Sequence, residues 1–583
     1  MTDAERRQEA EVLKKRLLAY VHHEAEADRK ALQEIWALGV AERVEAGECL
    51  AGLVRVADAA GDGVLRLRCE DFSAKFREGE PLFLGEGHSI ESGLPVVFEG
   101  YDLERGEVRV RRDRFAAGDR EEIPEASELQ LDKRGRHQRD LLLAGVDSVF
   151  RPENEDVVDA LLGRRRTEPD ASRRLAGEER GRALGLTERQ IEALGRTVST
   201  ESVALVHGPP GTGKTRVLAE AALALARRRC RLFVTAYTHR AIDNLLLSIR
   251  ALSPELPVFK VRRREEPELA RARISTLRNL DGSLPRPAVI GGTPYSVCRF
   301  HPERRFHFVL IDEAGQMPVV HGAIAMTQAR RYIVAGDPRQ LSPVRVGAHH
   351  DPNLKPSLFE FLERHYESVL LDRSFRLTDG LAGWISEEFY GGQLSSAEGV
   401  GSARLKAKDG GPLHEVLSPD HPLVLARVDH EGRTRRSREE AALVADLVSA
   451  LLGHHEIPAS EIAVLTPFRA QVRLIRHELG RRGLRAPDLV VDTVERMQGQ
   501  EREVVLLSLA SSDRDYLEGQ AEFFFDPGRL NVALSRARTK CIIVASRHAF
   551  RARPNELPAL LAATRFKRLS AAAFVVDLTA SYA

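Results

Sequence analysis

The stretch Gly208-Pro-Pro-Gly-Thr-Gly-Lys-Thr215 decides the fold of this chain. It follows the apolar run Val203–His207, which is typical of a buried strand, and it precedes the helical pattern Arg216–Ala226. A loop of the form GxxxxGK[ST] between a strand and a helix binds phosphate, because its backbone N–H groups and the helix N-terminus face the phosphate oxygens. The sequence therefore predicts a nucleotide-binding α/β domain around this loop.

Charged residues at two strand ends supply the chemistry that such a site needs. Within the loop, we expect Lys214 to reach the β- and γ-phosphates of ATP and Thr215 to bind Mg²⁺. Asp312 and Glu313 follow the apolar run Phe308–Ile311. We expect Asp312 to bind Mg²⁺, directly or through water, and Glu313 to polarise the attacking water. ATP and Mg²⁺ are the predicted cofactors.

Two further segments allow two interpretations each. Gly336–Pro343 follows another apolar run, and its Gln340 side chain is suited to sensing a γ-phosphate, although the segment taken alone is also typical of a turn. Thr187 and Gln190 have the spacing of a helix capping box. The alternative interpretation is that the Gln190 amide recognises adenine.

Apolar runs alternate with helical patterns from about residue 184 onward. The runs in the first half include Val203–His207 and Phe308–Ile311, and a second series begins at Val369–Leu371. Continuous apolar runs are typical of parallel strands that are buried on both faces. We predict an α/β fold with two RecA-like P-loop NTPase domains, each built on a parallel sheet, over residues 184–350 and 351–583.

The N-terminal third has a different hydrophobic pattern. Residues 1–47 have the pattern of a long stalk helix. Short alternating segments follow, among them Val108 and Val110 alternating with Arg109 and Arg111, and they predict a small β-barrel over residues 48–125. Residues 126–183 are charged and predicted to form second stalk or linker helices.

Composition excludes several classes of protein. No apolar run approaches the ~20 residues of a membrane span, and the charged N-terminus has no apolar signal core. The five cysteines lie far apart in the sequence, which argues against a zinc ribbon or an iron–sulfur cluster. The net charge of +1 means that any basic track for nucleic acid is local. We expect a monomer in the cytoplasm without membrane contact.

Four motifs, in this order, resemble superfamily 1 helicases of the nonsense-mediated-decay and immunoglobulin-μ-binding branch, superfamily 1B. Asp312–Gln316 resembles the DEAxQ motif of that branch, and Thr466–Gln471 resembles TPYxxQ. Thr493–Glu501 resembles TVDxFQGxE, and Arg529–Arg538 resembles RxNVAxTRA. The resemblance covers roughly residues 184–547 and implies a DNA or RNA helicase that hydrolyses ATP.

The resemblance also assigns roles to single residues. It makes Gln190 the adenine reader, Arg376 and Arg536 arginine fingers from the second α/β domain, and Glu501 a residue near the ribose or γ-phosphate. The implied catalytic set is Lys214, Glu313, Gln340, Arg376 and Arg536. The implied nucleotide-binding set is Gln190, Gly208, Pro209, Pro210, Gly211, Thr212, Gly213, Lys214, Thr215, Arg216, Glu501 and Arg538.

In the resembled branch a single strand lies across both α/β domains. By position, the strand contacts would be Thr235, Tyr237, Thr238, His239 and Thr293 in the first domain and Thr466, Arg469 and Thr493 in the second. Hydroxyl and backbone groups bind phosphates without reading bases. Aromatic rings stack on bases for ~1–3 kcal/mol each. Ordinary packing at a strand end is the alternative for the two aromatic residues.

The sequence departs from the branch in three places. Family QYR is Ser374-Phe375-Arg376 here, family SNxAxDN is Thr238–Asn244, and family QLPP is Gln340–Pro343. The catalytic groups survive all three changes. The second change falls on the strand-binding surface, so the preference between DNA and RNA is left open.

Two functions are compatible with these residues. The first is a single-strand-stimulated ATPase that moves 5′→3′, a polarity that rests on the resemblance, and that separates duplexes at junctions of single-stranded and duplex DNA or RNA. The second is an ATP-gated clamp that grips or remodels a nucleoprotein without processive unwinding. A P-loop kinase for a small substrate does not fit the length or the arginines of the second domain.

Overall fold

The computed structural model forms two compact units. It describes residues 2–582 except 57–63, 70–71, 73, 77–78, 87–89, 91–92, 103–104, 114–127, 136–137, 166, 263–265, 279, 281–283, 299–305, 346, 348–350, 409 and 485. One unit comprises Met1–Ala10, Gly145–Pro343 and Pro352–Ala583, and it contains both parallel sheets. The other comprises Glu11–Ala144 and Val344–Asp351, and it contains the barrel.

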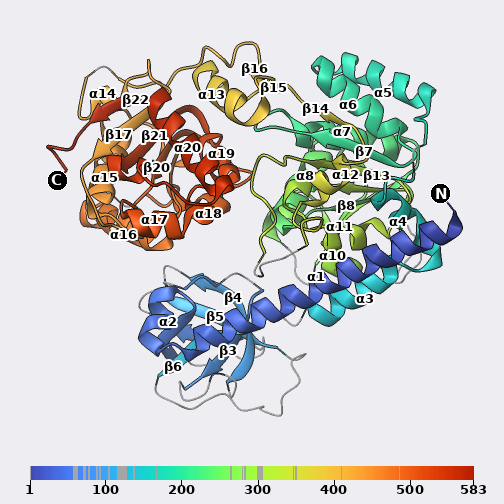
Figure 1. Ribbon diagram of the computed structural model, residues 1–583, viewed down its shortest axis with the longest axis horizontal. Helices are drawn as coiled ribbons and strands as arrows, with labels where there is room; N and C mark the ends of the chain where they lie inside the picture. The colour runs from blue at the N-terminus through green and yellow to red at the C-terminus, as the bar shows by residue number, and fades with distance from the viewer. Residues whose placement is uncertain are drawn as a thin grey trace. The chain divides into compact units, whose positions relative to one another are not determined.

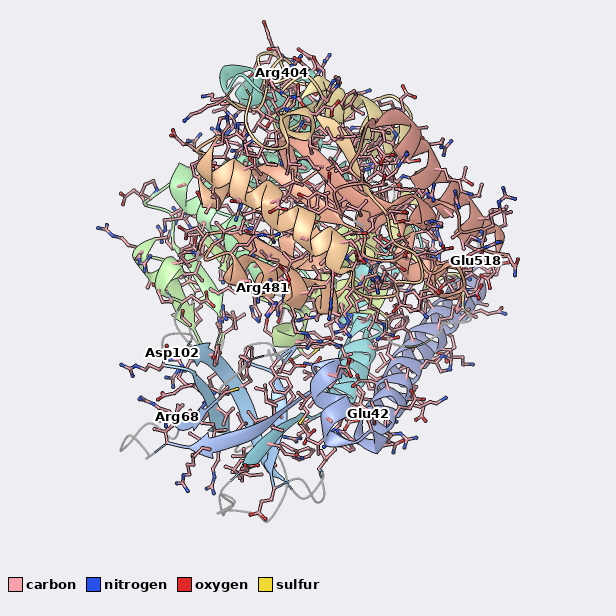
Figure 2. All side chains as sticks on the ribbon, turned by 90° about the vertical axis from the view of Figure 1, so that its left-hand side faces the viewer. Glu42, Arg68, Asp102, Arg404, Arg481 and Glu518 are labelled. Atoms are coloured by element: carbon pink, nitrogen blue, oxygen red, sulfur yellow. The ribbon has the colours of Figure 1, made fainter. Side chains whose placement is uncertain are left out.

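The barrel unit contains a closed barrel, which Figure 1 shows next to α2 (Val40–Ala46). Its strands are antiparallel, in the order β1-β2-β5-β4-β3-β6. Its strands are β1 (Cys49–Arg55), β2 (Val64–Arg68), β3 (Pro81–Gly85), β4 (Leu94–Asp102), β5 (Glu107–Arg112) and β6 (Leu129–Lys133). Val108 and Val110 are fully buried inside it, whereas Arg109 is exposed. Arg68, at the end of β2, is also exposed on the outer surface (Figure 2). The predicted alternation is confirmed.

The predicted end of the barrel at residue 125 is wrong. Residue 125 itself lies outside the described residues, but β6 follows it, pairs with β1 and β3, and closes the barrel. The alternation rule missed β6 because its polar residues are buried too. Asp132, in this strand, forms a buried ion pair with Arg43 of α2 (Val40–Ala46), with Nε and Oδ1 2.9 Å apart.

The predicted single stalk helix over residues 1–47 is interrupted at Leu38 and Gly39, and Gly39 is the N-cap of a second, short helix. Several helices precede the first sheet. They are α1 (Asp3–Ala37), α2, α3 (Arg139–Val149), η1 (Pro152–Asn154), α4 (Glu155–Leu161) and α5 (Ala171–Ala183). No helix among the described residues is long and apolar enough to cross a membrane.

The first sheet has eight strands in the order β10-β9-β11-β8-β12-β13-β7-β14, and all its pairings are parallel. The strands are β7 (Val203–His207), β8 (Arg231–Thr235), β9 (Val258–Val261), β10 (Ser275–Leu277), β11 (Ala288–Gly291), β12 (Phe308–Ile311), β13 (Tyr332–Gly336) and β14 (Ser368–Leu370). The helices and short turns among these strands are α6 (Glu188–Ser199), α7 (Lys214–Arg227), α8 (His239–Leu252), α9 (Pro267–Arg271), α10 (Pro294–Val297), η2 (Ala314–Gln316), α11 (Val319–Met326) and α12 (Leu358–Glu363).

The predicted boundary between the two α/β domains at residue 350 is also wrong. β14 pairs in parallel with β7, with Val369 opposite Val206, so the apolar run that we placed in the second domain completes the first sheet. An apolar run carries no information about which sheet it joins. The first domain therefore extends to at least Leu370.

The second sheet has six parallel strands in the order β19-β18-β20-β21-β17-β22. Its strands are β17 (Leu423–Val428), β18 (Ile462–Thr466), β19 (Val490–Thr493), β20 (Arg502–Ser508), β21 (Ala537–Ser546) and β22 (Phe574–Asp577). A short two-stranded sheet, β15 (Arg373–Ser374) with β16 (Ser395–Ser396), precedes it.

Helices cover both faces of the second sheet, and alternate residues of its strands point into two separate cores. One core contains α15 (Arg438–Gly453) and α16 (Arg469–Arg481). The opposite core contains α13 (Asp379–Tyr390), α19 (Pro527–Leu534) and α20 (Leu557–Ala572). The remaining elements of this domain are α14 (His414–Leu417), η3 (Ala459–Glu461), η4 (Val494–Met497), α17 (Arg514–Gly519), α18 (Ala521–Phe524) and η5 (Arg547–Phe550). Two parallel α/β sheets confirm the predicted fold class.

Candidate nucleotide and nucleic-acid site

The parallel register brings the predicted nucleotide-site residues to one edge of the first sheet. His207, the last residue of β7, is opposite Gly336 of β13, and Ile311 of β12 is opposite Val334. The loops that follow these strands therefore start side by side. In open parallel sheets, ligands bind at this carboxyl edge. The P-loop, Asp312 and the loop that carries Gln340 meet here.

The P-loop has a backbone that requires glycine. Gly211 and Gly213 have φ angles of 73° and 78°, in the left-handed region that side chains rarely adopt. A Cβ at Gly211 would lie 2.5 Å from the Cβ of Arg376, so this loop is also closely packed. α7 begins directly after Gly213, at Lys214. Its free N–H groups therefore point into the loop, as phosphate binding requires.

Lys214 is held by both predicted carboxylates. Its Nζ lies 3.2 Å from Oδ1 of Asp312 and 2.9 Å from Oε1 of Glu313. Burial alone would lower the pKa of Lys214, but the two negative charges raise it above its usual value. Burial raises the pKa of Asp312, in spite of the nearby ammonium. The Asp312 side chain is buried and that of Glu313 is partly exposed, so only Glu313 has access to solvent.

Gln190 forms the predicted capping box and also contacts the P-loop. Its Oε1 accepts from the Thr187 N–H at 3.0 Å, which confirms the capping interpretation. Its Nε2 donates to the carbonyl of Thr212 in the P-loop at 2.9 Å. The side chain is buried and engaged at both ends of its amide. Adenine recognition by Gln190 stays a prediction, and the structure adds a direct link from the cap to the P-loop.

Gln340 is more than part of a turn. Its Nε2 donates to Oδ2 of Asp337 at 2.7 Å, and its Oε1 lies 3.5 Å from Nη2 of Arg536. Arg536 lies between α19 and β21 of the second domain. A residue of the first domain and a residue of the second are therefore in contact at the nucleotide-site edge.

Arg536 is a buried cation, with 3% of its surface exposed. Within the described residues, its hydrogen bonds go to neutral groups: the carbonyls of Val532 and Gln500, Oγ of Ser535 and Oε1 of Gln340. Burial, followed by repulsion from Arg376, lowers the pKa of Arg536 to about 9. Its positive charge is therefore available to an anion.

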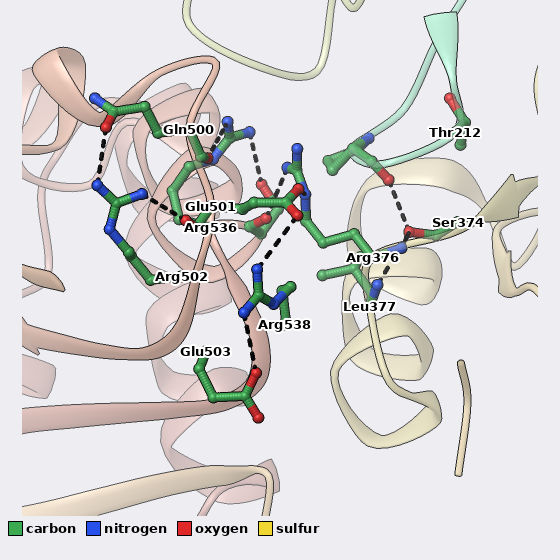
Figure 3. Close-up of polar contacts among 12 residues, drawn as sticks. Thr212, Ser374, Arg376, Leu377, Gln500, Glu501, Arg502, Glu503, Arg536 and Arg538 are labelled. Carbon is green, nitrogen blue, oxygen red and sulfur yellow. Dashed lines mark hydrogen bonds and ion pairs between the residues drawn. The ribbon is translucent and has the colours of Figure 1, made fainter. Parts of the chain in front are cut away.

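Arg376 is paired instead with an acid (Figure 3). Its Nε donates to Oε2 of Glu501 at 2.5 Å, and its Nη1 donates to the carbonyl of Ser535 at 3.1 Å. The adjacent Ser374, which replaces the family glutamine, donates from Oγ to the Pro210 carbonyl at 2.9 Å. The segment that carries Arg376 is thereby attached to the P-loop.

Two predicted nucleotide-site residues have other surroundings. Arg538 lies among carboxylates of its own domain. Its Nη2 is 2.6 Å from Oε2 of Glu461. Figure 3 shows its ion pair with Glu501, in which Nη1 is 3.7 Å from Oε1. Arg216 is exposed and donates to the Leu184 carbonyl. Neither contacts the P-loop in a described hydrogen bond, so their nucleotide contacts stay predictions.

The predicted strand-binding residues fall into two groups. Thr235, Thr466 and Thr493 end the parallel strands β8, β18 and β19, and they are buried together with Thr293. Thr238, Tyr237, His239 and Arg469 are exposed or half-buried. Thr238 also caps α8, accepting from the Ala241 N–H at 3.3 Å. The exposed group has direct access to a strand, and contact by all eight stays a prediction.

Sequence reasoning missed an aromatic cluster behind Tyr237. The ring of His321, on α11, meets the ring of Tyr237 edge to face at 5.4 Å between centroids. His321 Nε2 lies 2.8 Å from the hydroxyl of Tyr295. His321 lies in an apolar helical stretch that has no motif, so only its distant neighbours reveal it. Phe375 was also missed; its ring is half exposed, and its N–H donates to the Gly211 carbonyl at 2.9 Å.

Comparisons with known proteins match both α/β domains. A family model described as an AAA domain matches residues 185–379, and a second model of the same description matches residues 354–548. Together with the curated relatives, these matches make the chain similar to superfamily 1 helicases. Among those relatives are Dna2 and SMUBP-2 proteins.

The relatives are distant and longer than this chain. The DNA replication ATP-dependent helicase/nuclease DNA2 of Mus musculus is 26% identical over 648 residues, which cover 96% of this chain and 56% of that protein. The Schizosaccharomyces pombe helicase/nuclease dna2 is 28% identical over 62% of this chain and 28% of its own length. DNA-binding protein SMUBP-2 of Rattus norvegicus is 26% identical, over 62% of this chain and 43% of its own length. The chain thus spans about half or less of these relatives.

A helicase of known structure, Arterivirus nonstructural protein 10, is 15% identical to the chain. The alignment covers 86% of this chain and 77% of that one, with a TM-score of 0.38. At this TM-score the likeness adds nothing to the fold described above.

Proposed function

We propose that this chain is an ATP-driven nucleic-acid helicase, in which a single strand stimulates hydrolysis and hydrolysis drives 5′→3′ movement and duplex separation. One observation carries the proposal. The Lys214–Asp312–Glu313 cluster lies at the carboxyl edge of the first sheet, and Arg536 of the second domain contacts Gln340 at that same edge. A site built from two domains makes hydrolysis depend on how the domains are arranged.

Each residue of the site has a separate role in the proposed hydrolysis. Lys214 neutralises charge on the β- and γ-phosphates. Glu313, the partly exposed carboxylate, orients and polarises the attacking water. Arg536 and Arg376 supply positive charge from the opposite side, where a guanidinium is worth about 10³–10⁵ in rate.

The donor set also fits Mg²⁺. The Thr215 hydroxyl and the Asp312 carboxylate are the hard oxygen ligands that Mg²⁺ prefers. Asp312 Oδ1 accepts from the Glu313 N–H at 2.8 Å, which fixes the orientation of the carboxylate. When bound, Mg²⁺ supplies further positive charge against the phosphate oxygens.

We propose single-stranded DNA as the first substrate to test, because two kinds of relatives are described as a DNA replication helicase and a DNA-binding protein. Backbone contacts and stacking also suit RNA. The experiment compares ATP hydrolysis without nucleic acid and with single-stranded DNA and RNA of matched length and sequence, at a stated salt concentration. Hydrolysis that neither strand stimulates would contradict the proposal.

Strand separation needs its own experiment, because a clamp would also show stimulated hydrolysis. Forked duplexes with a 5′ or a 3′ single-stranded arm are incubated with ATP, and product strands are counted. We expect products from the substrate with the 5′ arm. Stimulated hydrolysis without product strands would favour the clamp that remodels nucleoproteins.

A further inference from the structure

The Asp337 carboxylate is the centre of a buried hydrogen-bond network beside the nucleotide site. It is 2% exposed, and its two oxygens have four polar neighbours. Oδ1 accepts from the Arg339 N–H at 2.9 Å and lies 3.2 Å from Nε2 of His207. Oδ2 accepts from Nε2 of Gln340 at 2.7 Å and from the Tyr390 hydroxyl at 2.6 Å. Burial alone would raise the pKa of Asp337, but these contacts lower it.

The neighbours of Asp337 come from both α/β domains. His207 ends β7 immediately before the P-loop, and Gln340 follows β13 in the same sheet. Tyr390 is the last residue of α13, whose apolar side packs in the core of the second sheet. The Tyr390 hydroxyl is therefore a contact of the second domain with a carboxylate of the first.

Asn531 of α19 strengthens this contact. Its Nδ2 donates to the Tyr390 hydroxyl at 2.8 Å and to the Arg339 carbonyl at 2.8 Å. Its Oδ1 is buried and has no hydrogen-bond partner within the described part of the chain. An unsatisfied buried oxygen costs free energy. Stability alone therefore does not account for an asparagine at this position.

The backbone of α19 also approaches Gln340 closely. A Cβ at Gly528, in the first turn of α19, would lie 2.2 Å from the Gln340 carbonyl oxygen. The main chain of Gln340 is thus in contact with the second domain, while its side-chain amide is bonded to Asp337. The amide that faces Arg536 has little freedom to turn.

We propose that Tyr390 and Asn531 are positioning residues for ATP hydrolysis. They hold Asp337, Asp337 holds the Gln340 amide, and Gln340 and Arg536 come together only when α13 and α19 are docked on the first domain. The arrangement of the two domains is thereby transmitted to the group that senses the γ-phosphate. This inference rests on the proposed ATP hydrolysis.

The test begins with Tyr390→Phe, which keeps the ring and removes the hydroxyl. We expect kcat for strand-stimulated hydrolysis to fall about tenfold, the effect of losing one hydrogen bond to a charged group, with KM for ATP within about twofold. Asn531→Ala is expected to act in the same direction. Tyr582→Phe is the matched control, because its hydroxyl donates to Oδ2 of Asp446 at 2.7 Å on the other face of the second sheet.

A second comparison separates positioning from plain stabilisation. In a Gln340→Ala background, Tyr390→Phe is expected to have no further effect on kcat, because it acts through that amide. A full additional loss in the double variant would overturn the inference. The inference would also be overturned if Tyr390→Phe lowers the melting temperature as much as Tyr582→Phe does but leaves kcat within twofold of wild type. Tyr390 would then contribute to stability alone.

The two proposals fail in different ways. If wild-type hydrolysis is no faster than that of Lys214→Met, the proposed function is wrong. If wild type is active, Lys214→Met is inactive and Tyr390→Phe is normal, only the positioning role is wrong.

Discussion

Two buried cations in this molecule have opposite surroundings. Lys214 has two carboxylates within 3.2 Å, which is more negative charge than it can balance. Arg536 is buried more deeply and makes its described hydrogen bonds to neutral oxygens only. The first domain thus presents excess negative charge to the site, and the second presents excess positive charge.

The difference indicates which ligand the two sides are built for. Excess carboxylate suits a divalent cation, and a guanidinium whose described hydrogen bonds go to neutral groups suits a phosphate, so the two together suit the proposed complex of Mg²⁺ and ATP. Burial of an unpaired charge costs several kcal/mol. Hydrogen bonds to neutral oxygens offset part of this cost for Arg536, which is expected to contribute to catalysis and not to stability. Lys214 is expected to contribute to both catalysis and stability.

The largest effect is expected for Lys214→Met. Hydrolysis should fall by at least about 10³-fold, because the phosphates lose their cation. The protein should also lose about 3 kcal/mol of stability, because the buried Asp312 carboxylate loses its cation while the partly exposed Glu313 remains beside it. Steady-state hydrolysis and thermal unfolding measure the two effects. Lys408→Met, at an ion pair with Glu456 on the surface of the second domain, is the control. Near-normal turnover would contradict the assignment of the P-loop.

Arg536→Met should separate activity from stability. We expect kcat to fall by about 10³-fold, much more than the affinity for ATP, because the guanidinium acts on charge that develops during the reaction. Stability should stay the same or rise, since a buried charge whose described hydrogen bonds go to neutral groups is replaced by an apolar chain of similar length. Equal losses in kcat and in ATP affinity would indicate a binding role.

Glu313→Gln should stop the chemical step while nucleotide still binds. We expect kcat to fall by about 10²–10⁴-fold, the usual contribution of a general base. Binding of a fluorescent ATP analogue should be retained, since Lys214 keeps its contact with Asp312. Glu518→Gln, at an ion pair with Arg514, is the matched control. Loss of nucleotide binding in Glu313→Gln would count against its role as the base.

The smallest effect is expected for Lys540→Met, a buried cation away from the nucleotide site. Lys540 donates to the carbonyls of Ser418 and His421, and burial lowers its pKa to about 7. Between pH 7 and about 10 the unfolded chain holds this proton and the folded chain does not. Wild-type stability should therefore rise with pH there, by up to about 1.4 kcal/mol per pH unit.

Below pH 7 both states are protonated, and this contribution to the pH dependence vanishes. Lys540→Met should remove the slope and leave kcat unchanged. Chemical unfolding of wild type and variant at several pH values measures the slope of the unfolding free energy against pH. A large loss of activity in this variant would mean that removing a buried cation far from the site also lowers kcat. The effect of Arg536→Met could then not be assigned to the charge of Arg536 at the nucleotide site.

The sequence predicted which side chains meet at the carboxyl edge of the first sheet, because Lys214, Asp312 and Glu313 lie in local motifs. Lys214 and Thr215 belong to one loop, and Asp312 and Glu313 follow one strand. A short motif therefore specifies both which residues are present and how their backbone is arranged. The sequence could not predict that Ser374 attaches to the Pro210 carbonyl or that Tyr390 contacts Asp337. Those contacts join residues that are far apart in the chain and carry no local pattern.

The amino-acid sequence by itself determined the P-loop motif and the parallel α/β class, because these depend on hydrophobic periodicity and on contiguous backbone geometry. Only the tertiary structure decided that β14 completes the first sheet, that β6 closes the barrel, and that Arg536 is buried without an acid in its described hydrogen bonds. Strand pairing and the compensation of charge are set by neighbours in space. A sequence pattern does not specify those neighbours.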